Sequence, residues 1–311
     1  MLSRTASCLY WLGRYVERAE FTARLVEATL RLDALSTRPS GEQAWLSALT
    51  VLGVEADYLA TGQAVTQEAA THFLTLDTSH PGSVVSCLDR ARDNAKAVRT
   101  ALSREAWSSI NRAWLLFQGR AAPGDTQDTL ELVQQAENET RGFDGAVGRM
   151  LHNPSSWFLK LGESVERADS TARLLDVKYH LLLPEGETVG GVVDRDQWQT
   201  ILHTVSAVNA YRWLYRDGLQ AAPVIELLVL RREMPRSLVA SCEEIVAMLG
   251  ELGTVSGAQG EADRLARRRL AALREARVSS IIAGGLHEYL TAFLHDNAAL
   301  DLAIARQFRF L

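Results

Sequence analysis

The chain has 311 residues, of which 47% are hydrophobic and 23% charged, and its formal net charge at pH 7 is −5. This composition is typical of a globular protein, and the length is enough for one large domain or two smaller ones. The acidic balance argues against a non-specific nucleic-acid binder, a class that usually has a high pI. No run reaches the roughly 18 apolar residues that a membrane helix requires.

The predicted elements, taken in chain order, are almost all helices. Apolar spacing predicts helices over 4–34, 42–60, 83–102, 104–119, 126–150, 155–183, 196–217, 236–252, 259–277 and 279–309, the last with a break near Gly284 and Gly285. The prolines fall between these segments, as expected of residues that break helices. Segments 61–80 and 221–233 have mixed patterns, and residues 72–77 fit either a short strand or the end of a buried helix. We therefore predict an all-α protein.

One block of sequence occurs twice. Residues 12–26 read LGRYVERAEFTARLV, and residues 161–175 read LGESVERADSTARLL. Further pairs follow in the same order: Trp45 with Trp198, Tyr58 with Tyr211, and Pro81-x-Ser83 with Pro235-x-Ser237. Ordered matches separated by loop insertions indicate an internal duplication. We predict a helical bundle of two tandem pseudo-symmetric repeats, residues 1–150 and 151–311, packed as one unit.

The apolar residues of each copy form one stripe on a helical wheel. The stripes are Leu12, Val16, Ala19, Ala23, Val26 and Leu30, and Leu161, Val165, Ala168, Ala172, Leu175 and Tyr179. This pattern is typical of a helix packed in a bundle, and the alanines allow a neighbouring helix to approach closely. The serines Ser83 and Ser237, two residues after a proline, have the character of helix N-caps.

Repeated charges flank both stripes. They are Glu17, Arg18, Glu20 and Arg24 in the first copy and Glu166, Arg167, Asp169 and Arg173 in the second. A pair spaced four residues apart on a solvated helix face contributes only about 0.2–0.5 kcal/mol, so many residue choices would serve there. Because the two copies share these charges while neighbouring positions differ, we expect the side chains to be partly buried at a shared interface or groove.

Three interpretations of these charges are open. They form a buried ion network that holds the two halves together, or the arginines bind a phosphate or carboxylate ligand. The third is a site for a hard cation made of four carboxylates. Two observations disfavour a metal: the arginines compete for the acids, and the Glu-x-x-His pairs of di-iron bundles are missing. We predict neither metal nor cofactor, and no motif identifies catalytic residues.

The three cysteines, Cys8, Cys87 and Cys242, are widely spaced. An odd and scattered set does not indicate a disulfide framework, and free thiols are typical of a reducing cytoplasm. The short apolar run near the N-terminus is followed at once by charged residues, which does not fit a secretory signal. We expect a cytoplasmic protein that binds neither nucleic acid nor a membrane.

The doubled Val-Glu-Arg-Ala-acid-x-Thr-Ala-Arg-Leu block, at 16–25 and 165–174, resembles the signature of the alpha-E family. This is an all-helical bacterial family named for its Glu-Arg motif and typically found as a tandem duplication. The Leu-x-Leu-x4-Pro-x-Ser segments at 74–83 and 228–237 and the C-terminal stretch 295–306 are also similar. The resemblance covers essentially the whole chain.

The resemblance implies a context for the protein. Members tend to be encoded beside, or fused to, circularly permuted ATP-grasp ligases, in neighbourhoods that also hold transglutaminase-like proteases and N-terminal-nucleophile hydrolases. It therefore implies an accessory partner of such a ligase in a peptide synthesis or modification system, with a peptide as a candidate substrate. The motif match makes Glu17-Arg18 and Glu166-Arg167 the functional candidates. At one position the copies differ, because Asp77 of the first corresponds to Arg231 of the second.

Two alternatives stay open beside this reading. One is an enzyme that binds a phosphorylated or carboxylated substrate in a groove lined by the Glu-Arg motifs. The other is a purely structural interaction module whose Glu-Arg pairs hold its two halves together.

Overall fold

The computed structural model describes residues 2–35, 41–120, 125–180 and 191–310, and in these ranges every regular element is a helix. The first half contains α1 (Ser3–Leu35), α2 (Gly41–Leu52), α3 (Glu55–Ala60), α4 (Gln67–Thr75), α5 (Val84–Ala97), a 3-10 turn η1 (Arg99–Ala101), α6 (Arg104–Phe117) and α7 (Thr126–Val147). The second contains α8 (Pro154–His180), α9 (Val192–Thr204), α10 (Val208–Leu214), α11 (Ala221–Val229), α12 (Leu238–Ser256), α13 (Glu261–Glu275), α14 (Val278–Gly284) and α15 (Leu286–Phe308). The all-α prediction is confirmed.

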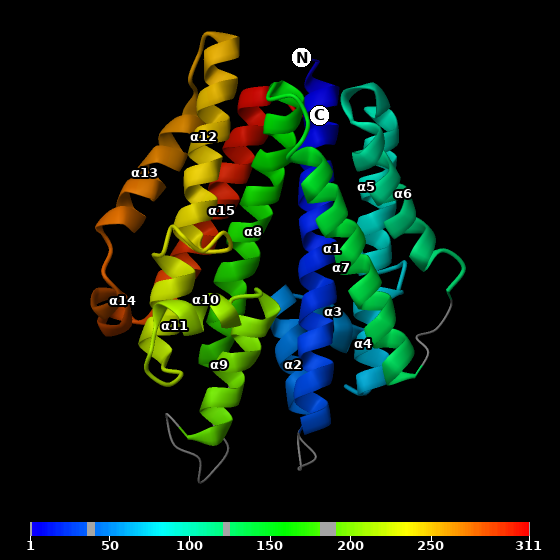
Figure 1. The fold of residues 1–311 in the computed structure, drawn as a ribbon, viewed down its shortest axis with the longest axis vertical. Coiled ribbons are helices and arrows are strands. Elements are labelled where there is room, and N and C mark those ends of the chain that lie inside the picture. Colours follow the sequence, from blue (N-terminus) through cyan, green and yellow to red (C-terminus); the bar gives the residue numbers. More distant parts are fainter. Residues whose placement is uncertain (1, 36–40, 121–124, 181–190, 311) are drawn as a thin grey trace.

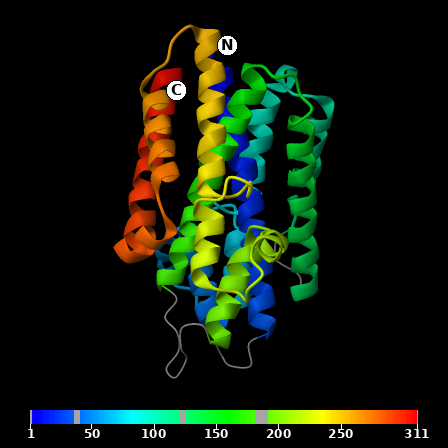
Figure 2. The same cartoon turned by 60° about the vertical axis from the view of Figure 1, so that its left-hand side comes forward.

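Helices α1 and α8 lie side by side at the centre of an elongated bundle (Figure 1). Helix α1 packs against α5 and α7, while α8 packs against α12 and α15. Figure 2 shows α12 (gold) between α13 and α15 (orange and red) on one side and α6 and α7 (teal and green) on the other. The helices of the two halves therefore follow a similar order around the central pair, while the predicted division at residue 150 stays a prediction.

The predicted helix ends differ from the structure where the backbone takes a left-handed turn. The predicted helix 42–60 is divided into α2 and α3 at Gly53, whose φ is +70°. The predicted helix 196–217 is divided into α9 and α10 near Ser206, whose φ is +54°. The alternative of a strand at 72–77 is wrong, because this segment closes α4, and the predicted end of the helix at 181–183 lies outside the described residues.

Both predicted N-caps are confirmed. The Ser83 hydroxyl accepts a hydrogen bond from the backbone N–H of Ser86 at 3.2 Å, and Ser237 accepts one from Ala240 at 3.1 Å. Each serine satisfies an N–H that the first turn of its helix leaves without a partner. These caps fix the starts of α5 and α12, the helices that pack on the central pair.

Two reciprocal glycines set the close approach of α1 and α8. A Cβ atom added to Gly13 would overlap the backbone carbonyl oxygen of Leu159, and one added to Gly162 would overlap that of Tyr10. The apolar stripes are buried as predicted, apart from Tyr179, whose side chain lies outside the described residues. Close packing at the glycines brings the charged flanks of the two motif helices within hydrogen-bond reach of each other. No described helix is long and apolar enough to cross a membrane.

Candidate functional site

The two Glu-Arg motifs meet across the α1–α8 interface and exchange partners. Arg18 binds Glu166 through two hydrogen bonds, Nε to Oε1 at 2.6 Å and Nη2 to Oε2 at 3.0 Å. In the opposite direction, Arg167 donates from Nη2 to Glu17 Oε2 at 2.7 Å. Both glutamates are buried, with only 1% of Glu17 and 4% of Glu166 exposed. The arginine of each motif therefore neutralises the glutamate of the other.

Glu166 receives its second arginine from α1. Arg14, one turn before the motif, donates from Nε to Glu166 Oε2 at 2.7 Å and pairs through Nη1 with Asp301 Oδ1 of α15 at 2.7 Å. The Tyr10 hydroxyl donates to the same Asp301 oxygen at 2.5 Å. Burial acts to raise the pKa of Glu166, but Arg14 and Arg18 lower it to about 2. Glu166 is therefore a stable carboxylate held between two guanidinium groups.

Glu17 receives its second arginine from a different part of the chain. Arg236, in the turn before α12, pairs with Glu17 and donates from Nη2 to Glu20 Oε1 at 2.9 Å. Burial acts to raise the pKa of Glu17, while Arg167 and Arg236 lower it, and the lowering prevails. In the matching turn of the first half the residue is Gly82, where an added Cβ would lie 2.9 Å from Nε2 of His80. In both sites the motif glutamate binds the arginine of the other motif, but its second arginine comes from a different part of the chain.

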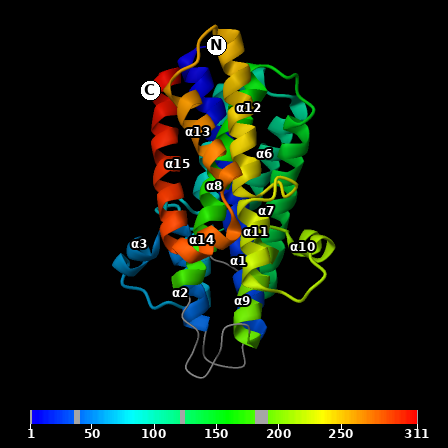
Figure 3. The same ribbon diagram turned by 90° about the vertical axis from the view of Figure 1, so that its left-hand side faces the viewer.

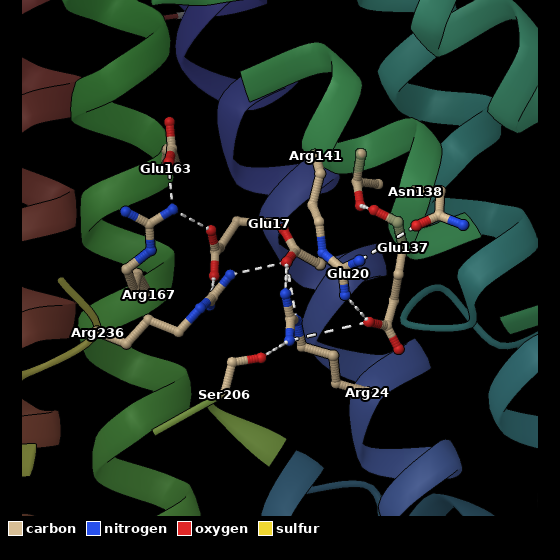
Figure 4. Close-up of polar contacts among 11 residues, drawn as sticks. Glu17, Glu20, Arg24, Glu137, Asn138, Arg141, Glu163, Arg167, Ser206 and Arg236 are labelled. Carbon is tan, nitrogen blue, oxygen red and sulfur yellow. Dashed lines mark hydrogen bonds and ion pairs between the residues drawn. The ribbon is translucent and has the colours of Figure 1, made fainter. Parts of the chain in front are cut away.

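The charged network continues from Glu20 toward α7 (Figure 4). Arg24 donates from Nε to Glu20 Oε1 at 2.8 Å and from Nη1 to the Ser206 hydroxyl at 2.5 Å, and it lies 3.8 Å from Glu137 Oε2. Arg141 donates to the same Glu137 oxygen at 2.5 Å. Burial raises the pKa of Glu137 to about 7, although Arg24 acts to lower it.

Two further carboxyl groups lie next to Glu17. Arg167 pairs with Glu163 as well as with Glu17. Burial and the charge of Glu17 raise the pKa of Glu163, against the lowering by Arg167. Burial raises the pKa of Asp144 well above its usual range, and the carboxyls of Glu163, Glu20 and Glu17 add to this effect. Carboxyl groups therefore outnumber arginines on the Glu17 side. This excess of acidic groups favours the protonated forms of Glu163 and Asp144.

The remaining predicted pair lies apart from this network. Arg173 donates from Nε to Asp169 Oδ2 at 2.6 Å, and Asn297 of α15 donates to Asp169 Oδ1 at 3.4 Å. Asn297 also accepts from the buried Arg269 at 2.7 Å. Arg173 is 40% exposed on its side chain, so this pair is the most accessible part of the motif.

The structure brings six of the eight predicted residues together at the α1–α8 interface, in two separate clusters of ion pairs. Arg18 and Glu166 lie in one cluster, and Glu17, Glu20, Arg24 and Arg167 lie in the other. The residues that sequence reasoning missed are Arg14, Glu137, Arg141, Asp144, Glu163, Arg236 and Asp301. A signal existed for two of them, because Arg14 and Glu163 lie one turn before the motif glutamates and differ between otherwise matching copies. Among the described residues no group of three or more His, Cys, Asp or Glu side chains could hold a metal ion.

Comparisons with known proteins agree with this picture. A family model, Alpha-E, described as a predicted alpha-helical domain with a conserved ER motif, matches residues 1–308. Uncharacterized proteins of Mycobacterium bovis and of two strains of Mycobacterium tuberculosis are 25% identical over 277 residues, which cover 82% of this chain and 30% of each relative. The chain therefore spans less than a third of the length of these relatives. No solved structure matches.

Proposed function

The chain belongs to the Alpha-E family, and on that premise we propose that it is an accessory subunit of a circularly permuted ATP-grasp ligase. In this proposal the ligase works in a peptide synthesis or modification system. The Alpha-E subunit contributes a rigid binding surface, and the ligase contributes the reacting groups.

The observation that carries the proposal is the engagement of both motif glutamates. Each is buried, and each is held by two arginines of this chain. A carboxylate paired in this way is stabilised in its charged form and has little capacity left to accept a proton or to bind a substrate. The Glu-Arg motif then fastens the two central helices, and the contacts that define function lie on the outer surface.

The lengths of the relatives support a partner role. The matching region is 30% of each mycobacterial chain, so in those proteins a related unit occurs together with a longer stretch of other polypeptide. A unit that works beside another protein is often found joined to it in a single chain. This favours a subunit over an independent enzyme.

The proposal is tested by co-expressing the full chain with the ATP-grasp protein encoded beside it. Native mass spectrometry should then detect a complex, and ATP consumption by the ligase in the presence of peptide should depend on the Alpha-E subunit. An unrelated ATP-grasp ligase is the control. If no complex forms, or if the ligase works equally well alone, the proposal is wrong; a complex without any effect on turnover favours the purely structural module.

A second candidate, an enzyme that binds a phosphorylated or carboxylated substrate beside the Glu-Arg motifs, is favoured by Asp144 and Glu163. Carboxyl groups whose pKa values are raised by burial and by like charges are typical of acid–base sites, and both lie beside Glu17. Asp144→Asn separates the two candidates: an accessory subunit should keep its effect on the ligase, whereas an enzyme should lose turnover with complex formation unchanged. Reversing Arg18 and Arg167 to glutamate tests the motif itself: an unfolded variant favours a purely architectural role for these pairs, whereas a variant that stays helical and loses turnover favours the enzyme.

A further inference from the structure

The surface around α10 in the second half has a cavity lined by aromatic and arginine residues. The cavity has a volume of about 300 Å³ and lies between α9, α10 and the segment 215–219. Its walls include the rings of Tyr211 and Tyr215 and the side chains of Arg212 and Arg216. Trp213, on the same short helix, is 83% exposed. Helix α10 projects from the edge of the bundle in Figure 3, where a partner can reach it.

A frame of two hydrogen bonds made by the Tyr211 hydroxyl borders this surface. The Tyr211 hydroxyl donates to the carbonyl oxygen of Gly218 at 3.3 Å and accepts from the N–H of Gln220 at 3.1 Å, which closes the loop after α10. The Tyr211 and Tyr215 rings lie 5.0 Å apart between centroids. Both Arg212 and Arg216 are exposed, and neither pairs with another described residue.

The first half has a similar frame without the same side chains. Tyr58, which corresponds to Tyr211, likewise donates to a carbonyl oxygen of the loop that follows, that of Ala64, at 2.8 Å. Counting from this tyrosine, Leu59 and Ala60 stand where the second half has Arg212 and Trp213. Arg212 and Trp213 are therefore not needed to build the loop. An exposed aromatic residue beside arginines is typical of interaction surfaces.

We infer that this surface binds an acidic peptide segment, with Trp213 packed on an apolar side chain and Arg212 and Arg216 paired with carboxylates. The inference deepens the proposed function by giving the chemical class of the peptide, and it rests on that function for its setting. A guanidinium group binds a carboxylate through two parallel hydrogen bonds, so the unpaired Arg212 of α10 and the unpaired Arg216 of the following segment select for acidic residues.

Size and charge favour a peptide over the other anionic partners. The cavity lies at the small end of ligand pockets, of about 300–1,000 Å³, which suits one side chain and leaves Trp213 outside to contact a longer chain. Nucleic acids bind mainly through many phosphate contacts. Here Asp217 lines the same cavity as the two arginines, and the whole chain has a net charge of −5. The surface therefore offers too few positive charges for the many phosphate contacts of a nucleic acid.

The test uses the full chain and the fluorescently labelled, capped peptide Glu-Leu-Glu-Glu-Leu-Glu. Fluorescence anisotropy should show binding that weakens as salt is added, because salt screens exposed charges. The double variant Arg212→Glu/Arg216→Glu and the single variant Trp213→Ala should each weaken binding by about tenfold or more, as expected for the anchors of an interface. Circular dichroism should show unchanged helicity in both variants.

The matched control is the double variant Arg264→Glu/Arg268→Glu on α13. Both arginines are exposed and likewise pair with no other described residue, so their reversal changes the net charge as much as the double variant of the cavity does, but away from the cavity. Binding within about twofold of the parent is expected for this variant. Equal weakening by Arg264→Glu/Arg268→Glu would overturn the inference. So would tighter binding of a lysine analogue of the peptide, of oligo-dT or of anionic vesicles.

The two proposals fail in different ways. Absence of peptide binding up to millimolar concentration overturns the acidic-peptide inference, whereas the ligase complex in native mass spectrometry is measured without peptide. A protein that binds the peptide but not the ligase contradicts the proposed function and keeps the peptide site.

Discussion

The two Glu-Arg motifs are identical in sequence but lie in unlike surroundings. On the Glu166 side, Arg14 and Arg18 face Glu166 and Asp301, and the charges balance. On the Glu17 side, Arg167 also pairs with Glu163, Arg236 also pairs with Glu20, and the carboxyl group of Asp144 lies nearby. What the two halves keep in common is the crossed pair, while the second arginine and the neighbouring acids differ. The repeated sequence therefore identifies the ion pairs that join the two halves, but not the charged residues that surround each pair.

Removal of the glutamates should give the largest difference between the two sides. Glu166→Ala leaves the half-buried Arg18 without its carboxylate and the buried Arg14 with Asp301 alone, and loss of one partner of a buried pair costs about 3–5 kcal/mol. Glu17→Ala should cost less, about 1–3 kcal/mol, because Arg167 keeps Glu163 and Arg236 keeps Glu20. Urea unfolding at pH 7 measures both losses.

Glu139→Ala provides the control for these two variants. Glu139 pairs with the exposed Arg112 at 2.9 Å, and such a surface pair contributes about 0–1 kcal/mol. Equal losses for Glu166→Ala and Glu17→Ala would contradict the asymmetry. An unchanged melting temperature for both would contradict the fastening role itself.

The two sides should also respond to pH in opposite directions. Burial raises the pKa of Glu137 from 4.5 to about 7, so its contribution to stability is fully present below pH 4.5 and is lost as the pH rises through 7. For Glu166, whose pKa is lowered from 4.5 to about 2, the contribution is present above pH 4.5 and is lost as the pH falls toward 2.

Glu137→Gln isolates the first of these effects. At pH 8 the variant should be more stable than the parent by up to about 3 kcal/mol, the free energy that corresponds to this change in pKa. At pH 4.5 the two proteins should have nearly equal stability. Urea unfolding at several pH values gives the comparison, and parallel pH profiles for parent and variant would show that the pKa of Glu137 is not raised in the native protein.

The glycines should behave alike in both halves. Gly13→Ala and Gly162→Ala each place a Cβ against a backbone carbonyl of the opposite helix. Overpacking of this kind costs about 1–3 kcal/mol, and it outweighs the gain of up to about 1 kcal/mol in helix propensity. Gly145→Ala in α7, where no atom lies within 4 Å of the added Cβ, should instead be stabilised. Thermal unfolding that ranks Gly13→Ala with Gly145→Ala would exclude the close approach.

The smallest expected difference concerns a threonine that both motifs share. Thr171 donates to the backbone carbonyl oxygen of Arg236 at 2.9 Å, whereas the buried Thr22 hydroxyl has no partner among the described residues. Thr171→Val should cost about 1 kcal/mol, and Thr22→Val should be neutral or slightly stabilising. Equal effects in urea unfolding would mean that Thr22 also has a hydrogen-bond partner in solution.

The helices and the charges that cross between them follow from local pattern. Stripes spaced at helical intervals predicted α1 and α8, and the shared charges flanking them predicted side chains partly buried at a shared interface or groove. Arg236 was not predicted, because it reaches Glu17 from a turn remote in the sequence. Its only trace is that the repeated Pro-x-Ser segment has Gly82 in one copy and Arg236 in the other.

The acids of α7 illustrate a different limit. Glu137 and Asp144 lie on an amphipathic helix beside Ala136 and Phe143, and helical spacing alone places them at the border of the buried face. Whether such a residue is exposed or buried depends on where the next helix packs, which is a tertiary property. The pKa shifts of these acids arise from this packing, so the composition of the helix does not reveal them.

The crossed pairs have the form of an isologous interface, in which residue A of one copy meets residue B of the other and B meets A in return. Arg18 with Glu166 and Arg167 with Glu17 satisfy this rule within a single chain. A polypeptide with one copy of the motif would reach the same arrangement only by self-association, and both of its sides would then be equal by symmetry. Because the two copies are joined in one chain, they can differ in sequence, and Arg236 occupies the position that corresponds to Gly82. The carboxyl groups beside Glu17 can then favour bound protons, while Glu166 stays charged between two arginines.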